Sequence, residues 1–214
     1  CGRFVMSLDS HPLANANSWL FVPASRPERI AKALASGADA VIVDLEDAVA
    51  PADKDAARAA LLQALDALPA QQRARLLVRI NAPGAEWFDA DVHALHTLCS
   101  QGCAGVVLPK AEDAAAMALL ANAVGSHGVV VPIIESVWGL HSIDTVAQAP
   151  KVLRLAFGHL DFQVDAGMAC AEDEQELLPV RMALVLASRR AGLAAPIDGV
   201  TVDTRNPERM GRDA

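Results

Sequence analysis

Aromatic side chains and positive charge are both scarce in this sequence. Tyrosine is absent, and three tryptophans and five phenylalanines are all the aromatic residues in 214 positions. The apolar content comes instead from alanine, leucine and valine, which suit helices packed around a buried sheet. The formal net charge of -8 argues against a nucleic-acid partner, which needs a basic face. An anionic ligand stays compatible, because a site can be locally basic within an acidic chain.

Long apolar runs are missing as well. No stretch is long enough to cross a bilayer, and the N-terminus lacks the apolar segment of a signal peptide. We therefore expect no membrane partner and a cytoplasmic protein. Residues 1–17 have no clear pattern and are interpreted as an N-terminal tail, in which Met6 could be the natural start and residues 1–5 a tag.

Cysteine spacing offers no disulfide framework and no zinc motif. No two cysteines form a Cys-x-x-Cys pair; the four are Cys1, Cys99, Cys103 and Cys170. A chain of this length does not need disulfides to be stable, so we expect reduced thiols. Cys99 and Cys103 are spaced like a metal pair, but no further ligands accompany them, and ordinary packing is the preferred interpretation.

Short apolar runs recur along the chain with helical stretches between them. The runs are nearly continuous, as in strands buried on both faces of a parallel sheet; they are Trp19–Val22, Ala40–Leu45, Leu76–Ile80, Gly105–Leu108, Val129–Ile134, Leu153–Phe157 and Pro196–Val200. Amphipathic segments alternate with them, namely Pro27–Ser36, Asp53–Leu68, Glu112–Val124 and Gln175–Ala191. This alternation predicts an α/β fold with a parallel sheet.

Two architectures fit that alternation, a doubly wound open sheet and a TIM (β/α)8-type barrel. No Gly-x-Gly-x-x-Gly follows the first run, which weakens the dinucleotide-binding alternative. Charged residues close many different runs instead, which is typical of barrels. We therefore predict one barrel domain over residues 18–214, with only about seven β/α units and without an eighth strand or a C-terminal lid. Such an open barrel would leave the edges of its first and seventh strands unpaired.

Three carboxylates follow the second run, at Asp44, Glu46 and Asp47. Their mutual repulsion must be relieved by a cation, a proton or an arginine. One of them could act as a general base or hold a metal-bound water; the alternative is a helix cap with solvated charges.

Arginines lie at two other predicted strand ends. Arg79 closes the third run, where a guanidinium can bind a carboxylate through two hydrogen bonds; a structural salt bridge to Glu46 or Asp47 is the competing interpretation. Arg26 and Arg29 follow the first run near a helix N-terminus, which favours anions, although they could equally be solvated helix charges.

The fifth and sixth runs each end near a single acid, Glu135 and Asp161. Two carboxylates from neighbouring strand ends can hold Mg²⁺, which completes its shell with water and substrate oxygens; two buried, ion-paired acids are the alternative. Gly158 would let the backbone approach a ligand closely, and the N–H groups of its neighbours His159 and Leu160 could bind a carboxylate. His93 and His96 have no acidic partner motif and are interpreted as surface residues.

Together these motifs resemble the citrate lyase β-subunit-like proteins of the HpcH/HpaI aldolase superfamily. The likeness preserves the order of the motifs from Ser18 onwards; they are LFVPASRPERIAKAL, GADAVIVDLEDAVAPADKDAAR, VRIN, GVVLPKAE, IIES, AFGHLDF and PIDGVTVD. The resemblance implies a TIM barrel, a homo-oligomer such as a trimer or hexamer, and Mg²⁺ (or Mn²⁺) bound by Glu135 and Asp161. It also implies that Arg79 binds the substrate carboxylate and that Phe21, Arg26 and Lys32 line a coenzyme A thioester site.

The function expected from this resemblance is a Mg-dependent carbon–carbon lyase. It would cleave or form a 3-hydroxy acyl-CoA thioester of the citryl-, malyl- or citramalyl-CoA type by retro-aldol or Claisen chemistry, with Asp44, Glu46 and Asp47 as unranked base candidates. One alternative is a metal-dependent aldolase acting on free 2-oxo acid adducts without coenzyme A. Another is a non-catalytic binding or assembly subunit.

Overall fold

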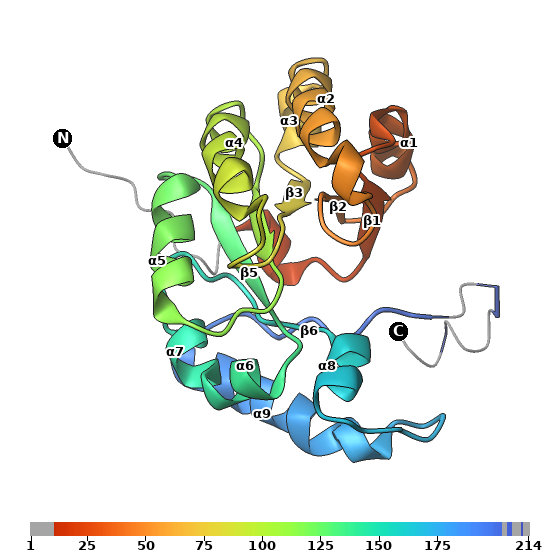
Figure 1. Ribbon diagram of the computed structural model, residues 1–214, viewed down its shortest axis with the longest axis vertical. Coiled ribbons are helices and arrows are strands. Elements are labelled where there is room, and N and C mark those ends of the chain that lie inside the picture. The colour runs from red at the N-terminus through yellow and green to blue at the C-terminus, as the bar shows by residue number, and fades with distance from the viewer. Residues whose placement is uncertain (1–10, 203–204, 207–210, 212–214) are drawn as a thin grey trace.

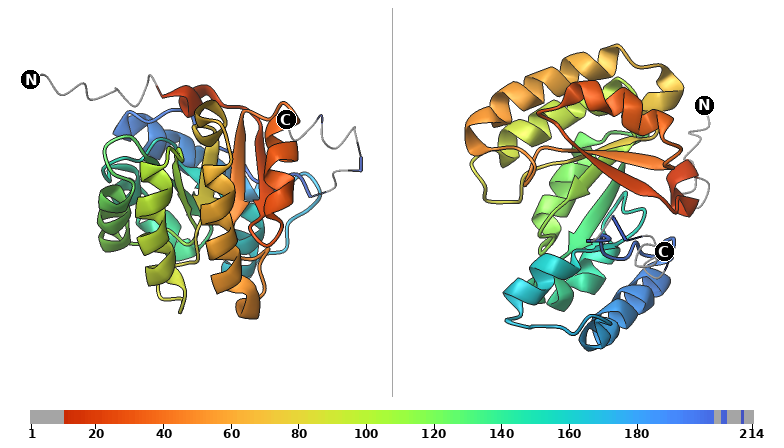
Figure 2. Two further views of the ribbon diagram at one scale, coloured as in Figure 1. Left: turned by 90° about the horizontal axis from the view of Figure 1, so that it is seen from above. Right: turned by 90° about the vertical axis from the view of Figure 1, so that its right-hand side faces the viewer.

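The computed structural model describes residues 11–202, 205–206 and 211. Its centre is a sheet of six parallel strands whose spatial order follows the sequence; the strands are β1 Trp19–Pro23, β2 Ala40–Asp44, β3 Leu76–Arg79, β4 Gly105–Leu108, β5 Val129–Ile134 and β6 Ala156–Phe157. The sheet curves into a half-barrel with its helices outside (Figures 1 and 2). The predicted α/β architecture is therefore confirmed as an incomplete TIM barrel.

Helices return the chain between successive strands. The α-helices are α1 Ile30–Ala35, α2 Lys54–Asp66, α3 Ala70–Arg73, α4 Phe88–Ser100, α5 Ala114–Ala123, α6 Val137–His141, α7 Ile143–Ala147, α8 His159–Asp165 and α9 Leu178–Ala191. The 3-10 turns are η2 Pro12–Asn15, η3 Pro27–Arg29, η4 Pro51–Asp53 and η5 Gln175–Leu177. Because every connection joins parallel strands, all the strands end at the same rim.

The first five strands agree with the predicted runs to within about one residue at the ends. The sixth is shorter than predicted, and the seventh run makes only an isolated bridge between Ala156 and Ile197. Pro196 has no N–H to offer a ladder. Beyond Ile197 the chain turns away, and Asp198 accepts hydrogen bonds from Arg181 instead of extending the sheet.

Apolar packing occurs on both faces of the sheet, which explains the nearly continuous apolar strands. The outer core joins the strands to the helices. In α2, for example, Ala57, Leu61 and Leu65 are buried at helical spacing. The inner core fills the concave face and includes Ile42, Leu77 and Val131 among others.

The N-terminal segment packs at the end of the half-barrel where the strands begin. Leu13, Ala14 and Ala16 are buried in the inner core, so this part of the predicted tail packs with the domain; residues 1–10, where the proposed tag falls, lie outside the described residues. The buried Arg154 donates to the carbonyls of Ala16 at 2.5 Å and Ala195 at 2.6 Å, and its guanidinium lies over Trp19. Arg154 therefore ties the first strand to the chain after α9.

Within the residues that the structure describes, no helix is long and apolar enough to cross a membrane. Within the part of the chain that the structure describes, Cys99, Cys103 and Cys170 form no disulfide. His93 and His96 are both exposed on α4, which confirms that they are surface residues.

Candidate active site

A bidentate ion pair lies at the rim where β2 and β3 end. Asp44 and Arg79 are register partners on these strands. Arg79 Nε donates to Asp44 Oδ1 at 2.7 Å, and Nη2 donates to Oδ2 at 2.6 Å. Asp44 also accepts from the backbone N–H groups of Glu46 and Ala48 at 2.9 and 3.1 Å. Because each of its oxygens accepts two hydrogen bonds, Asp44 is held in one orientation and is a poor candidate for the base.

The third nitrogen of the Arg79 guanidinium faces the other two acids. Nη1 lies 3.0 Å from Glu46 Oε2 and 3.3 Å from Asp47 Oδ2, so the salt bridges considered from the sequence are present. The guanidinium also lies 5.1 Å from the ring centroid of Phe21, which is a cation–π distance. Arg79 thus contacts three carboxylates, so acidic side chains outnumber the basic one in this group of four.

Glu46 has a raised pKa. Burial raises the pKa of Glu46 from 4.5 to about 8; Arg79 opposes this, whereas Asp47, Glu135 and Asp44 add to it. The Asp47 side chain is 71% exposed and therefore well solvated. A pKa of about 8 suits Glu46 to proton transfer near neutral pH.

Glu135 lies at the end of β5 and is buried. Burial raises the pKa of Glu135 from 4.5 to about 7; the Lys110 N–H lowers it and Asp161 raises it. That N–H donates to Glu135 Oε1 at 2.8 Å, and it comes from a residue with a left-handed backbone, φ 46°. A non-glycine residue in this conformation is slightly strained. The left-handed backbone of Lys110 directs its N–H at the Glu135 carboxylate.

Gly158 packs directly against Glu135. A Cβ atom at position 158 would lie 2.5 Å from both Cβ and Oε2 of Glu135, so only glycine fits. Asp161 follows in the first turn of α8. Gly158 thus approaches the side chain of Glu135 closely, while its expected approach to a ligand stays a prediction.

These groups suit a hard divalent cation. The charge of Asp161 contributes to the raised pKa of Glu135, and a cation bound by both carboxylates would relieve their repulsion and the burial of charge. No cluster of three or more His, Cys, Asp or Glu ligands occurs among residues 11–202, 205–206 and 211. Mg²⁺ needs only one or two protein carboxylates when water and substrate supply the rest, so the donor set fits Mg²⁺.

The residues expected to contact coenzyme A lie apart from this acid cluster, except for Phe21. Arg26 and Lys32 are exposed, on the turn before η3 and in α1. Arg26 Nε already pairs with Glu28 Oε1 at 2.5 Å. Leu160 is also exposed, at 45%.

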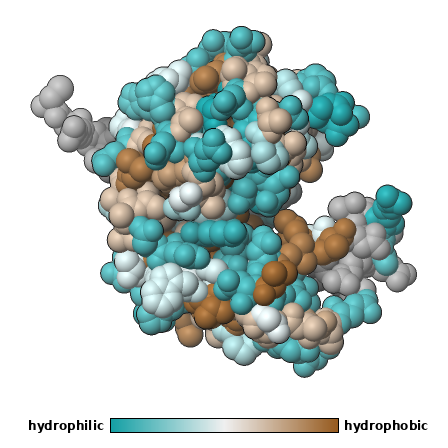
Figure 3. Space-filling model, viewed as in Figure 1, coloured by the Kyte–Doolittle hydropathy of each residue, from teal (hydrophilic) through white to brown (hydrophobic). Residues whose placement is uncertain are grey.

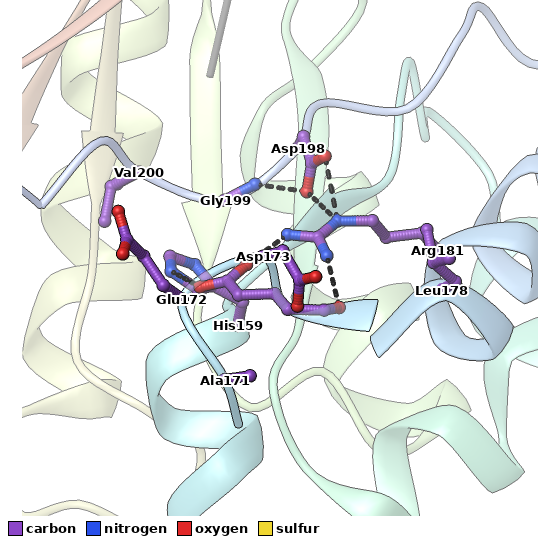
Figure 4. Close-up of a pocket in the computed structure, with 10 residues that line it drawn as sticks. His159, Ala171, Glu172, Asp173, Leu178, Arg181, Asp198, Gly199 and Val200 are labelled. Carbon is purple, nitrogen blue, oxygen red and sulfur yellow. Dashed lines mark hydrogen bonds and ion pairs between the residues drawn. The ribbon is translucent and has the colours of Figure 1, made fainter. Parts of the chain in front are cut away.

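His159 lines a cavity of about 780 Å³ near the ends of β6 and α8 (Figure 4). His159 Nε2 lies 3.4 Å from Glu174 Oε1, and Arg181 bridges Glu174 at 2.6 Å and Asp198 at 3.0 Å. Gly199 packs on the imidazole, since a Cβ there would lie 2.0 Å from Nδ1. Glu135, Asp161 and Arg79 do not line this cavity, so His159 faces a separate part of the rim.

Three residues around the two clusters were not singled out from the sequence. Glu174 and Arg181 come together only because the loop after α8 returns toward Asp198, and the sequence carries no signal for that contact. Lys54 does carry a signal. It continues the buried stripe of α2 at helical spacing, where a lysine is unusual.

Comparison with known proteins places these features in a family. Residues 17–214 match the model of the HpcH/HpaI aldolase/citrate lyase family. A citrate lyase subunit beta-like protein of Deinococcus radiodurans is 33% identical over 95% of this chain and 72% of its own length. An L-malyl-CoA/beta-methylmalyl-CoA lyase of Cereibacter sphaeroides is 35% identical over 70% of this chain, but only 50% of its own length is covered.

Solved structures show the same likeness. The citrate lyase beta subunit of M. tuberculosis, complexed with oxaloacetate and magnesium, superposes with a TM-score of 0.78 and 34% identity, over 94% of this chain and 86% of that one. A complex of the M. tuberculosis protein with magnesium, acetoacetate and coenzyme A gives the same TM-score and identity over 72% of its chain. The chain described above therefore belongs to the HpcH/HpaI aldolase/citrate lyase family.

Proposed function

We propose that this protein is a Mg-dependent carbon–carbon lyase acting on a 3-hydroxy acyl-CoA thioester of the citryl-, malyl- or citramalyl-CoA type. The observation that carries the proposal is the Arg79 guanidinium, which Asp44 orients and which lies 3.0 Å from Glu46 Oε2, together with the raised pKa values of Glu46 and Glu135. Relatives named as citrate lyase beta subunit and malyl-CoA lyase support it. So do related structures holding magnesium with oxaloacetate or coenzyme A.

In this proposal Glu135 and Asp161 hold the cation. The bound metal ion supplies Lewis-acid polarisation of the substrate's carboxylate and oxygen atoms. Arg79 attracts the substrate carboxylate, while Asp44 fixes the orientation of the guanidinium. The Phe21 ring covers one face of that guanidinium, so Phe21 borders the reacting end of the substrate rather than a distant phosphate.

Glu46 is the proposed base. Its carboxylate takes the proton of the 3-hydroxyl group as the C2–C3 bond breaks, and the electron pair of that bond moves to the thioester carbonyl. A 2-oxo acid or ketone and a thioester enolate result, and protonation of the enolate completes the cleavage. Because a nearby cation favours ionised carboxylates, metal binding would ionise Glu46 at neutral pH.

The experiment that tests this proposal combines the full chain with Mg²⁺ and a panel of citryl-, malyl- and citramalyl-CoA, and measures the released acyl-CoA and oxo acid. Glu135→Gln and Asp161→Asn should abolish turnover and weaken Mg²⁺ binding in calorimetry. Thioester cleavage that is unaffected by a chelator would contradict the proposal.

One observation favours the second candidate, an aldolase acting on free 2-oxo acid adducts. Arg26 is already paired with Glu28, so a coenzyme A phosphate would have to compete with that carboxylate. Cleavage of free hydroxy-oxo acids at a higher kcat/KM than any thioester would select this candidate.

A homo-oligomer, such as a trimer or hexamer, is part of the proposal. The outer side of α9 exposes apolar side chains at helical spacing, namely Leu178, Met182, Val185 and Leu186. A second apolar patch lies beside α8 (Figure 3) and includes Leu160, Val164, Val200 and Val202. Exposed apolar surface of this kind marks interaction sites. Light scattering should find an assembly, and Met182→Glu should shift it toward monomer; a monomer at all concentrations would refute this part.

A further inference from the structure

Lys54 is a buried lysine at the start of α2, only 5% exposed. Its ammonium donates to the carbonyl oxygens of Leu45 and Glu46, both at 2.8 Å, and lies 5.0 Å from the centre of the Trp87 ring. These contacts lie on the loop after β2 and on Trp87, the residue that precedes α4.

This position is unfavourable for a lysine in two ways. Lysine is rarely buried unless it is paired, and the first turn of a helix disfavours cations because of the helix dipole. The acids of the rim do not pair with Lys54 directly; its two hydrogen bonds go to backbone carbonyls. These two hydrogen bonds offset the unfavourable burial of the Lys54 ammonium group. Because they go to backbone carbonyls and not to a carboxylate, they hold a backbone segment in place.

The segment held is the one that carries Glu46. The Glu46 N–H donates to Asp44 Oδ1 at 2.9 Å, and the Glu46 carbonyl accepts from Lys54. The preceding carbonyl, of Leu45, accepts from Lys54 as well, while the Leu45 N–H donates to the carbonyl of Arg79 at 2.9 Å. Both peptide groups that flank Glu46 are therefore fixed, and with them the direction of its side chain toward Arg79.

We propose that Lys54 is a positioning residue, which holds the loop after β2 so that the Glu46 carboxyl stays in contact with Arg79. It acts through two backbone carbonyls and touches no substrate. The catalytic part of this inference rests on the proposed lyase function, in which Glu46 is the base; the structural part does not.

The test uses the full chain with three variants. Lys54→Met removes the ammonium but keeps the length of the stem, and Lys54→Arg keeps a cationic donor. Lys151→Met is the matched control, because Lys151 also donates to a backbone carbonyl, that of Ser126 at 2.7 Å, but lies near the start of β5, at the other end of the sheet.

Amide hydrogen exchange of residues 44–50 is measured for each variant, together with urea unfolding and the kinetics of thioester cleavage. Hydrogen bonds from a charged donor are among the stronger ones. Lys54→Met should therefore speed exchange in this segment at least about tenfold, without an equal change in strands β4 and β5. In Lys54→Met, kcat should fall by at least about tenfold with little change in KM. Lys54→Arg should partly restore kcat and the slow exchange at residues 44–50. Lys151→Met should leave kcat and this exchange unchanged.

Three results would overturn the inference. Unchanged exchange at residues 44–50 in Lys54→Met would show that the loop does not depend on Lys54. Faster exchange spread evenly over the whole chain would show a general stabilising role. A loosened loop with wild-type kcat would show that Glu46 does not need this support. If the wild-type protein cleaves no thioester, the lyase proposal fails, and the local exchange result still decides whether Lys54 positions the loop.

Discussion

The guanidinium of Arg79 and the carboxylate of Asp44 face each other across neighbouring strand ends and share two hydrogen bonds of 2.7 and 2.6 Å. Because the Asp44 side chain is only 2% exposed, this pair is shielded from water and keeps the plane of the guanidinium in one orientation. The remaining nitrogen then points at Glu46 and Asp47. Replacing the arginine would change the whole acid cluster, and not only one salt bridge.

Arg79→Lys should therefore lower kcat/KM by at least about tenfold although the charge is kept, because a single ammonium cannot contact Asp44 and Glu46 in the same way. Steady-state kinetics with the preferred substrate would check this. Arg75→Lys is the matched control, since Arg75 donates to the backbone carbonyls of Ala38 and Asp39 near the opposite end of the barrel. Equal kinetics for Arg79→Lys and wild type would show that Arg79 is structural only.

Gly158→Ala should disrupt the metal site more than the fold. The added methyl group would overlap Glu135 Cβ and Oε2, so the carboxyl group of Glu135 would have to shift. Isothermal calorimetry with Mg²⁺ should show weakened binding. Gly192→Ala, at a left-handed position with open space around it, should cost about 1 kcal/mol of stability without changing metal binding. Equal metal affinity in the two variants would argue against Glu135 as a ligand.

Stability of the metal-free protein should fall as pH rises. The folded-state pKa values of Glu135 and Glu46 are raised to about 7 and about 8 from 4.5, so between these limits the folded state binds more protons than the unfolded state. The contribution of these two groups to the free energy of unfolding is thus fully present below about pH 4.5 and is lost as pH rises through about 7 to 8. Urea unfolding at several pH values in a chelator should show this decline.

Excess Mg²⁺ should reduce that decline, because a cation stabilises the ionised carboxylates. In the metal-free protein, Glu46→Gln and Glu135→Gln should each reduce the fall in stability with rising pH. A metal-free protein whose stability rises over the same pH range would contradict the assignment of two raised pKa values.

Thioester binding should weaken with increasing salt if coenzyme A phosphates contact Arg26 and Lys32, since exposed charges are screened. Arg26→Ala should weaken binding and reduce its salt dependence, and Lys32→Ala should act in the same direction. Glu28→Gln should strengthen binding, because it frees Arg26 from its ion pair at 2.5 Å. Unaltered thioester affinity in the double variant Arg26→Ala/Lys32→Ala would exclude these contacts.

The sequence by itself determined the parallel α/β class and which residues lie at the rim. Nearly continuous apolar runs separated by amphipathic segments are typical of parallel strands covered by helices. Every residue that closes a run then lies at one end of the barrel. This reasoning identified Asp44, Arg79 and Glu135 as rim residues without any knowledge of their contacts.

Only the tertiary structure decided which rim residues touch and how their environments differ. Asp44, Glu46 and Asp47 are equivalent by spacing, but Asp44 is fixed by Arg79, Glu46 is half-buried with a raised pKa, and Asp47 is solvated. Burial and pairing depend on side chains brought from distant strands, which local pattern does not encode. For the same reason the sequence could not assign Lys54 to the loop of Glu46, nor reveal that the seventh run pairs at a single residue before its chain turns toward Arg181.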